Sequence, residues 1–116
     1  MLARVGARGF FAVLAWVWLG TAAAAGGAWR LAPERWDRPR DAAYVASLES
    51  VRAAVRAWET AAPGATLVLR YPGGEAGLLW ASELRDWLVA LGVEPEAVVL
   101  APGAGGEALV LAVEGG

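Results

Sequence analysis

The chain has 116 residues, 58% of them hydrophobic, with ten basic and twelve acidic side chains and neither histidine nor cysteine. This length suits one small domain, and the net charge of −2 argues against nucleic-acid binding, which depends on a basic surface. Since lysine is missing as well, the chain lacks disulfides, the thiolate and imidazole ligands of zinc sites, and the usual nucleophile–base pairs. We therefore expect no metal and no cofactor.

Residues 1–25 have the pattern of a secretory signal peptide. A start containing Arg4 and Arg8 precedes an apolar run at 10–19, and the small residues that signal peptidase requires follow, ending at Ala25. We expect cleavage near Ala25 and a periplasmic or secreted protein. The alternative is an inner-membrane anchor formed by an uncleaved N-terminal helix, although a spanning helix needs about 20 apolar residues.

Residues 26–40 are expected to form an extended arm ahead of a single domain at 41–116. Pro33 and Pro39 interrupt helical structure and favour extended geometry in the residues before them. Arginines outnumber acids in the arm, whereas acids outnumber arginines in the domain. The arm could therefore fold onto its own domain, or it could contact a partner or anionic lipid. The arm residues that would make such a contact are Trp29, Arg30, Arg35, Trp36 and Arg38.

The first predicted helix begins after Asp41, a suitable N-cap, and runs to about Ala61. Its apolar residues recur at helical spacing and define one face. This helix could be kinked near residues 47–50. The residues of this face are Tyr44, Leu48, Val51, Val55 and Trp58.

The rest of the chain alternates between strand and helix patterns. A strand is predicted at 66–71, a helix from 75 or 77 to 91 with Gly92 as its C-terminal cap, and further strands at 97–100 and 108–113. The prediction is an α/β fold of αβαββ order. It is a small sandwich of two helices on a three-stranded mixed sheet, with one parallel β-α-β crossover.

Residues 50–102 resemble the OmpA-like domain, a periplasmic module that binds peptidoglycan. The helix ending at 87–93 (WLVALGV) matches the family's aromatic-Leu-Val-x-x-Gly-Val pattern. The resemblance implies an α/β fold and contact with the cell wall. The family binds the diaminopimelate of peptidoglycan with an Asp in the turn and an Arg that opens the helix. Here the turn at 71–75 has no Asp, and Trp80 lies at the arginine position. The resemblance is therefore to a degenerate, truncated domain without this clamp.

The turn at 71–75 is the best candidate for ligand binding, because ligands of open α/β sheets bind beyond the carboxyl ends of strands. Its glycines can direct backbone N–H groups outward at a helix N-terminus, which favours an anion. They could equally serve only to permit a tight turn. Trp80 could pack in the core or stack on a sugar. The candidate residues are Arg70, Tyr71, Gly73, Gly74, Glu75 and Trp80.

The sequence favours a catalytic function less than a binding function. Glu83 and Asp86 lie three residues apart on the second predicted helix and could act as a carboxylate pair in a hydrolase, but a solvated charged face explains them better. The sequence thus predicts an exported, non-enzymatic binding or accessory domain whose partner is an envelope protein or a cell-wall component. The alternative is an interaction subunit that docks by a sheet edge or by the arm.

Overall fold

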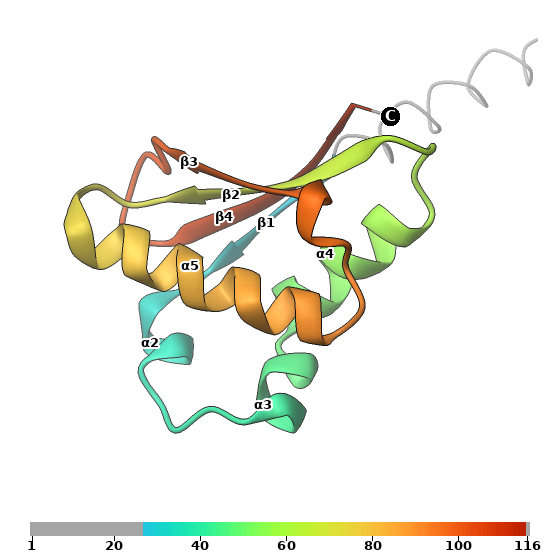
Figure 1. The fold of residues 1–116 in the computed structure, drawn as a ribbon. Coiled ribbons are helices and arrows are strands. Elements are labelled where there is room, and N and C mark those ends of the chain that lie inside the picture. Colours follow the sequence, from blue (N-terminus) through green and yellow to red (C-terminus); the bar gives the residue numbers. More distant parts are fainter. Residues whose placement is uncertain (1–26, 116) are drawn as a thin grey trace, which may run out of the picture.

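The computed structural model describes residues 27–115, which form a mixed α/β fold of two layers (Figure 1). The expected signal peptide, its cleavage site and the alternative anchor lie outside the described residues. One layer is a four-stranded mixed sheet, and the helices lie together on one of its faces. Within 27–115, no helix has both the length and the apolar character needed to cross a membrane.

The strands are β1 (Ala28–Leu31), β2 (Ala65–Tyr71), β3 (Val98–Pro102) and β4 (Leu109–Gly115). Their order in the sheet is β1-β4-β2-β3. β2 and β3 run parallel, and β4 is antiparallel to both β1 and β2. The predicted parallel β-α-β crossover is therefore confirmed. The third predicted strand is inserted between β1 and β2.

The prediction of three strands was wrong, because β1 lies in the segment expected to be an extended arm. β1 pairs with β4 from Ala28 to Leu31, and Leu31 is only 2% exposed. Four residues are too few to show a clear strand pattern, and the partner strand lies at the other end of the chain. Pro33 does not prevent a helix either. It occupies the first turn of the short helix α2 (Pro33–Trp36), where its missing N–H leaves no hydrogen bond unmade.

The single helix predicted from Asp41 is divided into α3 (Ala42–Ser47) and α4 (Glu49–Glu59). The break falls at Leu48, whose ψ of 126° is extended, within the region where a kink was left open. Asp41 caps α3 as predicted, since its Oδ1 accepts a hydrogen bond from a backbone N–H of the first turn at 2.8 Å. The residues that this helical segment buries completely or nearly so are Val45, Leu48, Val51 and Ala54.

The long helix α5 (Gly74–Ala90) has nearly its predicted bounds and connects β2 to β3 through a short 3-10 helix, η1 (Pro95–Ala97). Gly92 follows its C-terminus with a φ of +110°, a conformation that glycine adopts without strain. The core lies between α4, α5 and the sheet face that they cover. On α5 it is formed by Gly77, Ala81, Leu84 and Leu88.

Candidate functional site

Backbone geometry explains Gly74 in the turn at 71–75 and Gly77 just after the turn, but not Gly73, whose φ is −58° and which has no atom within 4 Å of an added Cβ. Gly74 has a φ of +86°, which other residues adopt only with strain. A Cβ on Gly77 would lie 1.8 Å from the carbonyl oxygen of Pro72, so only glycine permits this close approach of α5 to the turn. Glu75 is exposed in the first turn of α5, where its charge already complements the helix dipole.

The structure does not bring Arg70 and Tyr71 together at this turn. Tyr71 packs against the core on the face that the helices cover. Arg70 points to the other face of the sheet, where its Nη2 lies 3.3 Å from Oε2 of Glu114. The candidate residues at 70–75 therefore do not converge on one site.

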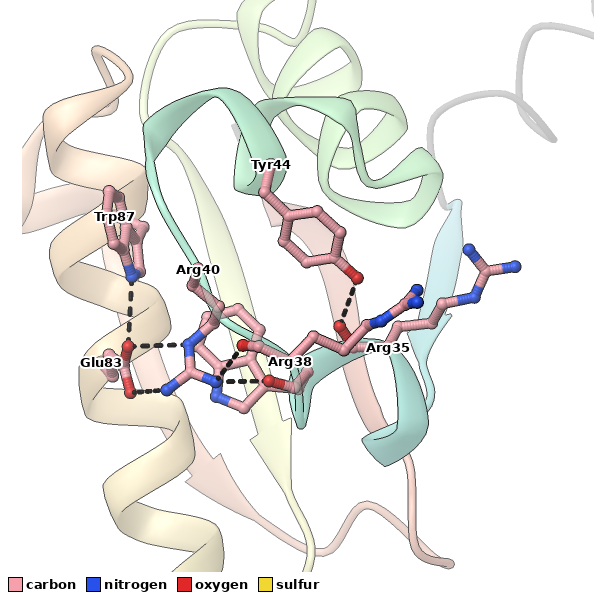
Figure 2. A network of polar contacts seen from close by, with 7 residues as sticks. Arg35, Arg38, Arg40, Tyr44, Glu83 and Trp87 are labelled. Atoms are coloured by element: carbon pink, nitrogen blue, oxygen red, sulfur yellow. Dashed lines mark hydrogen bonds and ion pairs between the residues drawn. The ribbon is translucent and has the colours of Figure 1, made fainter.

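A different group of side chains joins the loop after α2 to α5 (Figure 2). Arg40 donates hydrogen bonds from Nε and Nη2 to the two carboxylate oxygens of Glu83, both at 3.0 Å. The indole N–H of Trp87 donates to the same carboxylate at 3.3 Å. The third guanidinium nitrogen donates to the carbonyl oxygens of Trp36 and Arg38. Arg40 thus fixes the chain that follows α2 against the side of α5.

This network holds Glu83 in its ionised form. The hydrogen bond from Arg40 is the largest cause that lowers the pKa of Glu83, and it is assisted by the Trp87 hydrogen bond and by the charge of Arg40. Together they outweigh partial burial, which acts in the opposite direction. A carboxylate held in this way is poorly suited to donate a proton. Asp86, the other member of the candidate hydrolase pair, is exposed and makes no ion pair within residues 27–115.

Trp36 and Trp80 meet beside this network and form the floor of a cleft between α2 and α5. Their ring centroids are 6.3 Å apart with an interplanar angle of 26°, and Trp36 is 5% exposed. The guanidinium carbon of Arg40 lies 4.5 Å from the Trp36 ring centroid, a cation–π contact. The α2–α5 cleft has a volume of about 260 Å³ and is lined by Pro33, Trp36, Asp37, Ala76, Leu79, Trp80 and Glu83.

Two features of the α2–α5 cleft stand out. Leu79 is 69% exposed, the highest value among the large hydrophobic residues of the described chain. In addition, the Nε1–H of Trp80 is buried and has no hydrogen-bond acceptor among the described residues. Exposed apolar side chains mark binding surfaces when they gather in a patch, and here Leu79 adjoins the Trp36–Trp80 pair and follows a second exposed leucine, Leu78.

The predicted arm residues take different positions. Trp36 lies in the cleft and Trp29 packs against the core from β1, whereas Arg35 is exposed within α2 and Arg38 is exposed just after it. Sequence reasoning missed Arg40 and Leu79. The excess of arginines before residue 41 was the only sign of the Arg40–Glu83 pair, whose members are 43 residues apart.

A second hollow, of about 530 Å³, lies at the other end of the sheet, beside 58–66 and 94–97. It is bordered by the carboxylates Glu59, Glu94 and Glu96. No group of three metal-ligating side chains is found in the part of the chain that the structure describes. This hollow offers open polar surface without a converging set of functional groups.

Comparisons with models of protein families, with curated proteins and with solved structures found no significant match.

Proposed function

We propose that the chain is an exported, non-enzymatic binding module of the cell envelope, and that the α2–α5 cleft receives an apolar side chain of a partner protein. The observation that carries the proposal is Leu79, 69% exposed at the edge of the Trp36–Trp80 stack. Aromatic and aliphatic side chains around a small cleft are typical of the anchoring points of protein interfaces.

The cleft suits a protein side chain better than a sugar. A sugar stacks on an exposed ring face, whereas Trp36 is 5% exposed and has both Arg40 and Trp80 against its ring. The accessible part of the cleft is aliphatic, at Leu79, Pro33 and Ala76. Of the two carboxylates that line the cleft, Glu83 is already paired with Arg40 and Asp37 lies at the edge, so the accessible surface offers mainly apolar contact.

The charges at the cleft also restrict the partner. Glu83 is already neutralised by Arg40, while Asp37 is exposed at the edge and makes no ion pair among residues 27–115. A partner segment with an apolar residue followed by lysine or arginine would therefore fit, with its apolar residue against Leu79 and its cation near Asp37.

A matched pair of substitutions tests the proposal. Leu78 and Leu79 are both exposed on α5, but only Leu79 lines the cleft. The tagged protein is isolated from the envelope of the cells that produce it, as wild type, Leu79→Asp and Leu78→Asp. We expect a defined protein to be retained by the wild type and by Leu78→Asp and to be lost from Leu79→Asp. Retention of the same proteins by all three would refute the assignment of the cleft.

The cell-wall alternative is tested by sedimentation with purified peptidoglycan. Trp80, which stands where the OmpA-like family has its ligand-binding arginine, is stacked on Trp36 and supplies no charge. We expect the protein to stay in the supernatant. If it pellets with peptidoglycan, the partner is the wall and not an envelope protein.

Export depends on residues 1–25 and is tested separately. N-terminal sequencing of the protein from the envelope is expected to begin close to residue 26. An intact Met1 would support the inner-membrane anchor instead.

A further inference from the structure

The indole N–H of Trp80 is a buried hydrogen-bond donor on the floor of the α2–α5 cleft. The ring is partly exposed, but its Nε1 is the one buried side-chain nitrogen or oxygen atom without a hydrogen-bond partner among the described residues. Two other indoles are paired within the fold. Trp58 donates to the carbonyl oxygen of Ala65 at 3.0 Å, and Trp87 donates to Glu83 at 3.3 Å. A buried donor without an acceptor is costly, so its presence beside a cleft calls for a functional explanation.

The two carboxylates that line the cleft do not supply the missing acceptor. Glu83 accepts hydrogen bonds from Arg40 and from Trp87, and Asp37 lies at the exposed edge. Apart from the two indoles, the remaining lining side chains contain no polar atom. The cleft therefore has a donor without an acceptor, and a bound partner can supply the acceptor.

We propose that the indole N–H of Trp80 donates to a backbone carbonyl oxygen of the partner segment that the α2–α5 cleft binds. The inference rests on the proposed function and specifies its partner. An apolar side chain packs against Leu79, the adjacent carbonyl oxygen accepts from Trp80, and the lysine or arginine that follows lies near Asp37. A neutral carbonyl fits better than a carboxylate, because Asp37 would repel a negative charge.

The carbonyl oxygen can reach Trp80 only if one wall of the cleft moves, because Nε1 is covered in the free protein. The helix α2 can move in this way. It has four residues, and no backbone hydrogen bond joins it to α5 in the part of the chain that the structure describes. Side chains hold it in place, namely the Trp36–Trp80 stack and the bonds of Arg40 to Glu83 and to the carbonyl oxygen of Trp36. We therefore expect α2 to move outward transiently and expose the Trp80 N–H.

Hydrogen exchange of the indole N–H groups tests this access without a partner. The tryptophans are labelled with ¹⁵N, and Trp80→Phe and Trp58→Phe assign the two signals. Trp58 is the control, because its N–H is bonded within the fold. We expect the Trp80 N–H to exchange about tenfold faster than the Trp58 N–H, or more. Equal or slower exchange of Trp80 would overturn the proposal.

A titration with acetyl-Leu-Lys-amide tests the hydrogen bond. The probe carries the apolar side chain, the carbonyl groups and the cation of the proposed segment, and it is added to about 20 mM because so small a ligand binds weakly. We expect the indole proton of Trp80 to move downfield and that of Trp58 to stay unchanged. Acetyl-Leu-Glu-amide should bind about fivefold more weakly, because its charge opposes that of Asp37.

The same titration separates this inference from the proposed function. If the probe shifts the backbone amides of residues 76–80 but not the indole proton of Trp80, the cleft binds an apolar side chain and the inference alone is wrong. If it shifts neither, both are contradicted.

Replacing Trp80 by benzothienylalanine removes the donor and keeps the shape, because a sulfur atom takes the place of the N–H. The free protein should keep its melting temperature, since no hydrogen bond is lost, but it should bind acetyl-Leu-Lys-amide about tenfold more weakly. At position 58 the same replacement should lower the melting temperature by about 5 °C, because the carbonyl oxygen of Ala65 loses its donor, and leave probe binding unchanged. Unchanged binding with the analogue at position 80 would overturn the proposal.

Discussion

Arg40 joins α2 to α5 through one side chain. It binds the carboxylate of Glu83 on α5, the backbone at the end of α2, and the ring of Trp36. Nearby, the hydroxyl of Tyr44 on α3 donates to the carbonyl oxygen of Arg35 at 2.6 Å. These contacts hold α2 in the position that forms one wall of the α2–α5 cleft.

The Arg40–Glu83 pair should contribute measurable stability. In a double-mutant cycle of Arg40→Met and Glu83→Gln, urea unfolding should give a coupling free energy of about 1 kcal/mol; the value is modest because the Glu83 side chain is 42% exposed. The control is the Arg52–Glu49 pair, which is more exposed and separated by 3.8 Å. Its coupling should stay below about 0.5 kcal/mol. Equal couplings in the two cycles would contradict the role given to Arg40.

The same pair predicts a pH dependence. The pKa of Glu83 in the folded protein lies below its ordinary value of 4.5, so the unfolded chain takes up a proton first as the pH falls. The stabilisation is therefore fully present above pH 4.5 and is lost as the pH falls through the lower, folded-state pKa. The stability difference between wild type and Glu83→Gln should shrink with falling pH in this window. A difference that grows on acidification would mean that the pKa is raised.

Gly73 in the turn before α5 and Gly77 within α5 should respond differently to substitution. Gly77→Ala should destabilise the protein by about 2–3 kcal/mol, because the new Cβ meets the backbone of Pro72 at 1.8 Å. Gly73→Ala should change stability by less than about 0.5 kcal/mol, since its φ is −58° and no atom lies within 4 Å of the added Cβ. Thermal unfolding measures both. A similar loss of stability in the two variants would contradict the close approach of Gly77 to the backbone of Pro72.

At the scale of elements, β1 and α2 should behave as parts of the fold and not as a free arm. Leu31→Ala and Trp36→Ala should each cost about 2–4 kcal/mol, because both side chains are at least 95% buried in the core. Arg38→Ala, an exposed position of the same segment, should be nearly neutral. Chemical unfolding distinguishes these outcomes. Neutral behaviour of Trp36→Ala would mean that α2 does not dock on α5.

The elements that sequence predicted well are those with strong local signals. β2, α5 and β3 follow from a turn with Pro72, a helical apolar pattern and the capping Gly92, and Asp41 marked the start of α3 correctly. β1 was missed because its identity depends on pairing with β4. The break at Leu48 could be located only to a few residues, because an extended residue between two helices carries no local signature such as Pro or Gly.

The candidate site could be predicted from the sequence less well than the helices and strands could. Trp36 and Trp80 were considered separately, one as a possible contact of the arm and the other as a core or sugar-stacking residue. Their contact depends on the position of α2, which is set by residues far along the chain. The exposure of Leu79 follows from the same arrangement, because the helical face that α5 turns to the core is centred on Ala81, Leu84 and Leu88.

At the scale of the whole molecule, the helices and the four-stranded sheet form two layers (Figure 1). The α2–α5 cleft is lined by residues of α2, of the loop after it and of α5, so it belongs to the helical layer. A partner bound in this cleft would contact the helices and leave the opposite face of the sheet free.

The most direct test of the cleft as a protein-binding site is photo-crosslinking in the producing cell. A benzophenone amino acid is placed at position 79 or, as the control, at position 78. We predict a discrete protein adduct from position 79 that is absent or much weaker from position 78. Equal adducts from both positions, or none from either, would contradict the proposal that the α2–α5 cleft binds an envelope protein.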